Sequence, residues 1–120
     1  MKNCKKIFIS GKMTGLEKYN FPKFDEIEKR LQAVNVPCVN PAHISRQFKE
    51  EDVLNNKDVF DEMIGRQMWA MMDCDAILLI GDNWNTSGGV MRELKIAFAK
   101  NMKIFLESDL VKLEVEYKGK

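Results

Sequence analysis

A short stretch in the second half of the chain combines anion-binding residue types with a carboxylate. Ser87, Gly88 and Gly89 follow an apolar run at 76–80 and open a helical pattern. A helix start presents unpaired backbone N–H groups, to which Ser87 adds a hydroxyl, while the two glycines let a ligand approach the backbone. Glu93 follows about one turn into the helix. The stretch therefore predicts a site that holds a phosphate and places a carboxylate against the attached group.

A second loop of similar character follows the first apolar run, at 6–10. It contains Gly11, Lys12, Met13 and Gly15. Lys12 in such a loop is a candidate partner for a phosphate or carboxylate, although any single lysine can also be only a surface charge. The glycines could serve turns alone. Their place directly after a strand is what favours a ligand loop.

The elements that must position these loops alternate along the chain. We expect strands at 6–10, 36–39, 76–80 and 103–106, and helices at 20–34, from Asn56 to about residue 72, and from the Gly-Gly pair to Lys100. Asn20 is expected to cap the first helix, Asn101 to end the last one, and 103–106 to be a core strand. Residues 42–56 are interpreted as a mobile lid or excursion with at most a turn of helix, and the tail after Glu107 as an edge strand or a subunit contact.

This alternation predicts a small doubly wound, Rossmann-like α/β fold, in which helices cover both faces of a parallel sheet. One domain is expected to span residues 1–120. Ligands of such sheets bind at the carboxyl ends of the strands, where the loops 10–15, 40–41 and 81–89 emerge together. Asp73 and Asp75 precede a strand and are expected at the opposite end, as capping and solvating groups.

Composition excludes several functional classes. The 120 residues are 45% hydrophobic and carry a formal net charge of +1, so a broad nucleic-acid surface is not expected. No apolar run approaches the roughly 20 residues of a membrane span, and we expect a cytoplasmic protein without a membrane partner. Cys4, Cys38 and Cys74 are expected to be reduced thiols. With a single histidine and no CxxC pair, neither a metal nor another cofactor is expected.

Taken together, the motifs resemble a known family of small proteins common in phages and prophages. That family is similar to the nucleoside 2-deoxyribosyltransferases and to the 2'-deoxynucleoside 5'-monophosphate N-glycosidases. The resemblance extends over most of 6–106, and its motifs are Phe8–Gly15, Tyr19–Phe24, Val39–Pro41, Asp73–Ile77, and Trp84 with Ser87, Gly89 and Glu93.

The resemblance implies an activity and roles for individual residues. In the enzymes of this superfamily a glutamate early in the helix attacks the anomeric carbon and expels the base, and Glu93 occupies that position. We expect Glu93 to be ionised near neutral pH. Ser87 with the helix start would bind the 5'-phosphate, and Gly11 and Lys12 would line the phosphate and sugar side.

The sugar and base side is expected to involve Met13, Asn40, Gln67 and Trp84. Met13 and Trp84 could cover a nucleobase face or could be packing residues. The enzymes carry an acidic residue where this chain has Gln67, and an amide can bind a hydroxyl but cannot donate a catalytic proton. His43 could replace that acid.

Three functions remain open at this point. The first is an N-glycosidase or deoxyribosyltransferase-like enzyme that acts on a nucleoside 5'-monophosphate or related small nucleotide. The second is a non-catalytic nucleotide-binding protein, a sponge or sensor, and the third is a structural subunit. The resemblance further implies a homo-oligomer, with the Met-rich helix at 56–72 and the tail as candidate contacts.

Overall fold

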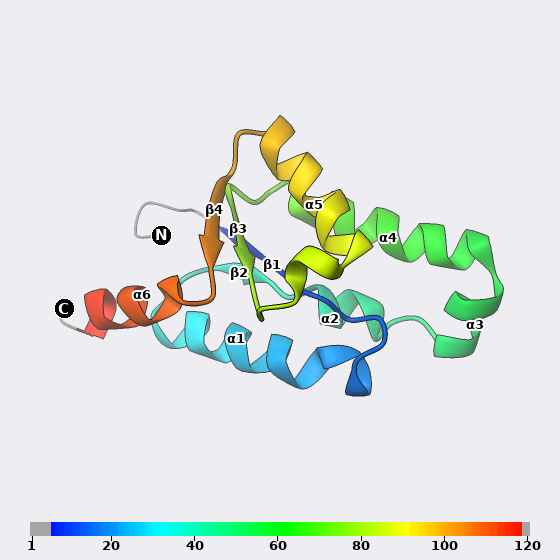
Figure 1. Ribbon diagram of the computed structural model, residues 1–120, viewed down its shortest axis with the longest axis horizontal. Helices are drawn as coiled ribbons and strands as arrows, with labels where there is room; N and C mark the ends of the chain where they lie inside the picture. Colours follow the sequence, from blue (N-terminus) through cyan, green and yellow to red (C-terminus); the bar gives the residue numbers. More distant parts are fainter. Residues whose placement is uncertain (1–5, 119–120) are drawn as a thin grey trace.

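The computed structural model describes residues 6–118, without the side chains of residues 113 and 116–118 (Figure 1). Four strands and six α-helices alternate along most of this range. The strands are β1 (Ile7–Ser10), β2 (Cys38–Val39), β3 (Ala76–Leu79) and β4 (Lys103–Leu106). The helices are α1 (Phe21–Ala33), α2 (Pro41–Ser45), α3 (Glu50–Asn55), α4 (Lys57–Met71), α5 (Gly88–Ala99) and α6 (Asp109–Lys118), with 3-10 turns η1 (Glu17–Asn20) and η2 (Trp84–Thr86).

The four strands form one parallel sheet in the order β2-β1-β3-β4. Ile7 of β1 is paired with Ala76 of β3, and Ser10 with Leu79, so the two central strands end together. The expected α/β fold is confirmed. Because the strands are parallel, the loops after β1, β2 and β3 all leave from one edge, which is where the candidate site lies.

Alternating strand side chains build a separate core on each face of the sheet. On one face, Ile7 and Ile9 pack with α1 and with Leu110 of α6. On the other face, Phe8 packs with Met71 at the end of α4 and with the apolar side of α5. Figure 1 shows α1 below the sheet and α5 above it, so helices cover both faces as a doubly wound fold requires.

The segment 42–56 is not an irregular excursion, because it contains α2 and α3. Asn40 initiates α2: its side-chain oxygen accepts a hydrogen bond of 3.0 Å from the Ala42 N–H, and Pro41 occupies the first turn. The first turn of α3 contains three acidic residues, Glu50, Glu51 and Asp52. Their negative charges interact favourably with the positive end of the helix dipole. These local signals lie in elements too short to show a hydrophobic period.

Three further expectations about the elements are corrected. Strand β4 is an edge strand with mostly exposed residues, because no strand beyond it pairs in the described sheet. The tail after Glu107 is not an edge strand, because it forms α6, whose Leu110 is fully buried; a subunit contact by this tail stays a prediction. Asn20 precedes α1 in a left-handed conformation (φ 63°), but its side chain donates to the Lys12 carbonyl at 3.1 Å and does not cap the helix.

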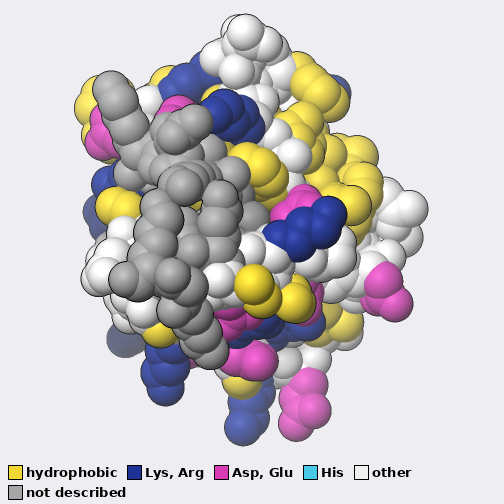
Figure 2. Space-filling model, turned by 90° about the vertical axis from the view of Figure 1, so that its left-hand side faces the viewer, with side chains coloured by type: hydrophobic (Ala, Val, Ile, Leu, Met, Phe, Trp, Pro, Cys, Tyr) yellow, Lys and Arg dark blue, Asp and Glu magenta, His cyan; other side chains and the backbone are white. Residues whose placement is uncertain are grey.

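The surface carries apolar side chains near β4 and α6. Ile104, Leu106 and Val111 are 38%, 45% and 58% exposed. Figure 2, which views the molecule from the side of α6, shows hydrophobic side chains gathered at one side of that face, with charged side chains among them. No helix within residues 6–118 is long and apolar enough to cross a membrane.

Candidate functional site

A cavity of about 620 Å³ opens at the carboxyl edge of the sheet. Its walls come from the loop after β1, from α2 and α4, and from the segment that leads into α5. Gly11, Lys12 and Met13 contribute from the first loop, and Ser87 and Glu93 from the last segment. Two loops that are more than 70 residues apart in sequence are thus brought to one cavity, as the parallel sheet predicts.

Glu93 is held in this cavity by a strand residue. The Ser10 hydroxyl, fully buried at the end of β1, donates a hydrogen bond of 2.7 Å to Oε1 of Glu93. Burial raises the pKa of Glu93 to about 7, against the opposing effects of the Ser10 hydrogen bond and the charge of Arg92. The pKa of Glu93 therefore lies close to neutral pH, so the protonated carboxyl group is also populated there, whereas the sequence predicted an ionised group.

The start of α5 is open toward the cavity. Ser87 caps the helix through its hydroxyl, which accepts from the Val90 N–H at 3.2 Å. A Cβ on Gly88 would meet no atom within 4 Å, and one on Gly89 would lie 3.6 Å from the Arg92 guanidinium. Neither glycine is thus required by packing, so their absent side chains leave the first N–H groups of the helix accessible to an anion.

Two cationic side chains line the same cavity. Lys12 reaches across from the first loop, and its Nζ donates to Oγ1 of Thr86 at 3.2 Å, so it lies beside the segment that leads into α5. Arg92 contributes a guanidinium from the first turns of α5. A phosphate at the helix start would therefore find two positive charges as well as backbone donors.

Gly11 has a structural reason of its own. A Cβ at this position would lie 2.5 Å from Cγ1 of Ile80 and 3.2 Å from the ring of Phe24. Contacts under 3.0 Å require a neighbour to move, so the close packing of the two strand ends excludes a side chain here. The glycine thereby sets where the first ligand loop begins.

Gln67 lies on α4 and lines the cavity while only 8% exposed. Its side-chain Nε2 donates a hydrogen bond of 2.8 Å to Oγ of Ser45, the last residue of α2. This bond fixes the orientation of the amide. The amide oxygen remains an acceptor for a ligand hydroxyl. Among the lining residues in the described part of the chain, Glu93 is the only carboxyl group.

Most of the predicted site residues meet at this cavity, and two do not. Gly11, Lys12, Met13, Gln67, Ser87, Gly88, Gly89 and Glu93 all line it. Asn40 is 3% exposed and does not line the cavity. Its side-chain oxygen caps α2, and its Nδ2 donates a hydrogen bond of 2.9 Å to the Asp25 carboxylate. Trp84 packs against the core on the α5 face and is likewise outside the lining.

His43 also lies outside the cavity lining. Its Nε2 is 2.7 Å from the Glu28 carboxylate, and Asp25, Glu28 and His43 offer atoms within 4.8 Å of one another. Arg46 already pairs with Asp25, and the Asn40 amide contacts both carboxylates, so protein groups satisfy this cluster. None of the three residues lines the cavity.

Two cysteines lie within the described residues, and both are free thiols. Burial raises the pKa of Cys38 and of Cys74 to about 11, so neither is an activated nucleophile near neutral pH. Cys4 falls outside the described residues.

Two residues of the site, Ser10 and Arg92, were not predicted from the sequence. Ser10 ends an apolar strand, and a buried polar residue at the carboxyl end of a parallel strand is itself a signal of a site. Arg92 looks like an ordinary helix-surface charge in sequence, and only the position of the helix start places it at the cavity.

Comparison with protein families adds one finding. A family model described as "Domain of unknown function (DUF4406)" matches residues 5–106. The chain belongs to the DUF4406 family. The matched range includes every residue that lines the cavity, and it ends at the last residue of β4, before α6. No curated protein matches this DUF4406 chain.

Proposed function

We propose that this DUF4406 protein cleaves the N-glycosidic bond of a nucleoside 5'-monophosphate or related small nucleotide, with Glu93 as nucleophile. One observation supports this most directly: a carboxyl group fixed by Ser10 shares a cavity with a helix start, Lys12 and Arg92. Such a reaction needs an anion-binding group for the phosphate of the substrate and a fixed carboxylate at its anomeric carbon.

Cleavage would proceed in two steps through a glycosyl-enzyme ester. An ionised oxygen of Glu93 attacks the anomeric carbon, the C–N bond breaks, and its electron pair leaves on the base nitrogen, which takes a proton. Water then attacks the glycosyl-enzyme ester and regenerates the carboxylate, or a second base attacks and the sugar is transferred. The phosphate, bound at the α5 start, holds the anomeric carbon in position while this occurs. Gln67 would orient a sugar hydroxyl.

The proton for the departing base must come from another source than a second carboxyl group. Gln67 stands where the related enzymes carry an acid, and His43 is engaged by Glu28 away from the cavity. The Lys12 ammonium would be bound to the phosphate, so water in the open cavity would supply the proton, which predicts slow turnover or a base that leaves without assistance. The same observation favours a second function, a nucleotide-binding protein without turnover.

Mass spectrometry of ribo- and deoxyribonucleoside 5'-monophosphates incubated with the protein distinguishes the two functions. Base release by the wild type that is lost in Glu93→Gln, but kept in Glu26→Gln, would support the enzyme. Glu26 is an exposed carboxylate on α1 and a matched control for the loss of one negative charge. Nucleotide retained intact by both the wild type and Glu93→Gln would instead support the binding protein. No affinity for any nucleotide would support a structural subunit.

A homo-oligomer also stays a prediction. Trp69 on α4 and Phe98 on α5 are 80% and 68% exposed, and exposed apolar side chains of this size are candidates for a contact between copies where they form a patch. Sedimentation velocity of the wild type and of Trp69→Gln would test whether α4 contributes to a contact between copies.

A further inference from the structure

A second cavity, of about 580 Å³, lies beside the one that contains Glu93. Tyr19, Phe21 and Phe48 line it, together with Val53 and Leu54 of α3. Each of the two cavities by itself has the volume of a typical ligand site, about 300 to 1,000 Å³. The combined space is therefore larger than a small nucleotide needs.

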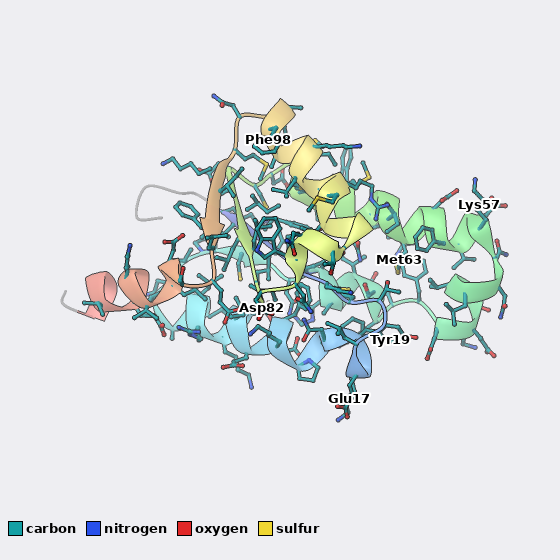
Figure 3. All side chains as sticks on the ribbon, in the orientation of Figure 1. Glu17, Tyr19, Lys57, Met63, Asp82 and Phe98 are labelled. Atoms are coloured by element: carbon teal, nitrogen blue, oxygen red, sulfur yellow. The ribbon has the colours of Figure 1, made fainter. Side chains whose placement is uncertain are left out.

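The two cavities adjoin each other, because they share part of their lining. Met13, Thr14, Ser45, Phe60 and Met63 line both. The start of α5 and Glu93 line only the first cavity, and α3 lines only the second. The space thus extends from the helix start toward α3, at the right-hand end of Figure 1. Figure 3 labels Met63 on α4 and Tyr19 on η1, which approach this space from opposite sides.

The two ends of this space differ in charge. Lys12, Arg92 and Glu93 line the first cavity. The charged residues of the second cavity, Arg46 and Glu50, are both occupied by protein partners.

Arg46 pairs with Asp25 and lies over the Phe21 ring, 5.1 Å from its centroid. Glu50 accepts a hydrogen bond from the Tyr19 hydroxyl. What these contacts leave exposed to a ligand is mainly aromatic and aliphatic surface, to which an apolar group would bind.

Tyr19 is presented to this cavity by an unusual backbone. Lys18, Tyr19 and Asn20 all have positive φ, of 51°, 54° and 63°, a region that residues other than glycine rarely adopt. Such conformations cost free energy and persist only where surrounding structure fixes them. The turn is held by the Asn20 contact to the Lys12 carbonyl and by the Tyr19 contact to Glu50, so it links the first loop, which lines the first cavity, to α3, which lines the second.

Resting on the function proposed above, we infer that the ligand is a nucleoside 5'-monophosphate whose base carries a bulky apolar or aryl substituent. The phosphate binds at the α5 start, the sugar lies beside Glu93, and the substituent on the base enters the second cavity. An unsubstituted nucleotide would occupy the first cavity alone and leave the aromatic surface of the second exposed to water.

Calorimetric titration with matched nucleotides tests this inference. The probes are AMP with N6-benzyl-AMP, and dUMP with 5-phenyl-dUMP, in the Glu93→Gln protein so that turnover does not consume them. Burial of one aromatic ring predicts about tenfold tighter binding, or more, for the substituted member of at least one pair. The variant Val53→Gln/Leu54→Gln makes the α3 wall polar and should reduce that gain, while affinity for the unsubstituted nucleotide stays unchanged.

The matched control is Val111→Gln/Val115→Gln, which changes two exposed valines of another helix, α6 (58% and 68% exposed). It should retain the full gain. The inference is overturned if neither substituted nucleotide binds more tightly than its parent, or if the α3 variant weakens parent and substituted nucleotides equally. Binding of none of the four probes would overturn the proposed function as well, which separates the two failures.

Discussion

Replacing Glu93 by glutamine should stabilise the fold at alkaline pH. The pKa of Glu93 is about 7 in the folded protein and near the ordinary 4.5 when the chain is unfolded, so the folded state holds this proton more tightly. Stability therefore falls as pH rises from 4.5 to 7 and stays lower above that. At about 1.36 kcal/mol per pKa unit, the cost of ionised Glu93 reaches about 3 kcal/mol at pH 8.5, but remains under about 1 kcal/mol at pH 5.

Urea unfolding of the wild type, Glu93→Gln and the control Glu26→Gln at pH 5 and pH 8.5 measures this cost. A glutamine oxygen can still accept the Ser10 hydrogen bond, so the variant removes the charge with little change in shape. We expect Glu93→Gln to exceed the wild type by about 3 kcal/mol at pH 8.5 and by much less at pH 5. A difference that is the same at both pH values, or one that Glu26→Gln reproduces, would refute the reasoning.

Three other substitutions separate the roles of neighbouring residues. Ser10→Ala removes a hydrogen bond that lowers the pKa of Glu93, so this pKa should rise further. Base release, which needs the carboxylate, should then increase with pH at a higher midpoint in a rate–pH profile. Gly88→Ala should leave thermal stability equal or slightly higher, because a Cβ there meets no atom, yet should weaken nucleotide binding in calorimetry. Gly11→Ala should cost about 1 to 3 kcal/mol in urea unfolding, because its Cβ would overlap Ile80; an unchanged midpoint would show that the strand ends can separate.

Much of the fold follows from the sequence because its longer elements carry strong periodic patterns. The continuous apolar residues of β1 and β3 are typical of strands buried on both faces, and both strands are observed there. The helical period of 57–71 likewise predicts α4 within a residue or two. In α2 and α3 the elements span only five and six residues, which is too few for an amphipathic period to be visible.

The candidate site, like the fold, could be predicted from the sequence only in part. Ser87 and Glu93 are separated by six positions on one helix start, and local spacing was enough to predict that they lie together, as they do in the lining of one cavity. The pKa of Glu93 could not be predicted, because it depends on burial by distant segments and on Ser10, 83 positions away. For Trp84 the sequence left open both a role at the site and a role in packing. A loop residue beside a site can turn toward the core, as Trp84 does, and only packing decides between the two.

The contact between Gly11 and Ile80 has a consequence for motion at the site. The residues from which the first and last ligand loops depart are packed against each other, and Ser10 and Glu93 are joined beside them. This side of the cavity must then move with the sheet, so opening it requires disruption of the core. Ligand entry would accordingly depend on the far wall of the adjoining second cavity, where Tyr19 of the left-handed turn at 18–20 lies with α3, an element with no buried residues. Specificity and access would be determined by the same wall, and changes in α3 could alter both without disturbing the carboxylate.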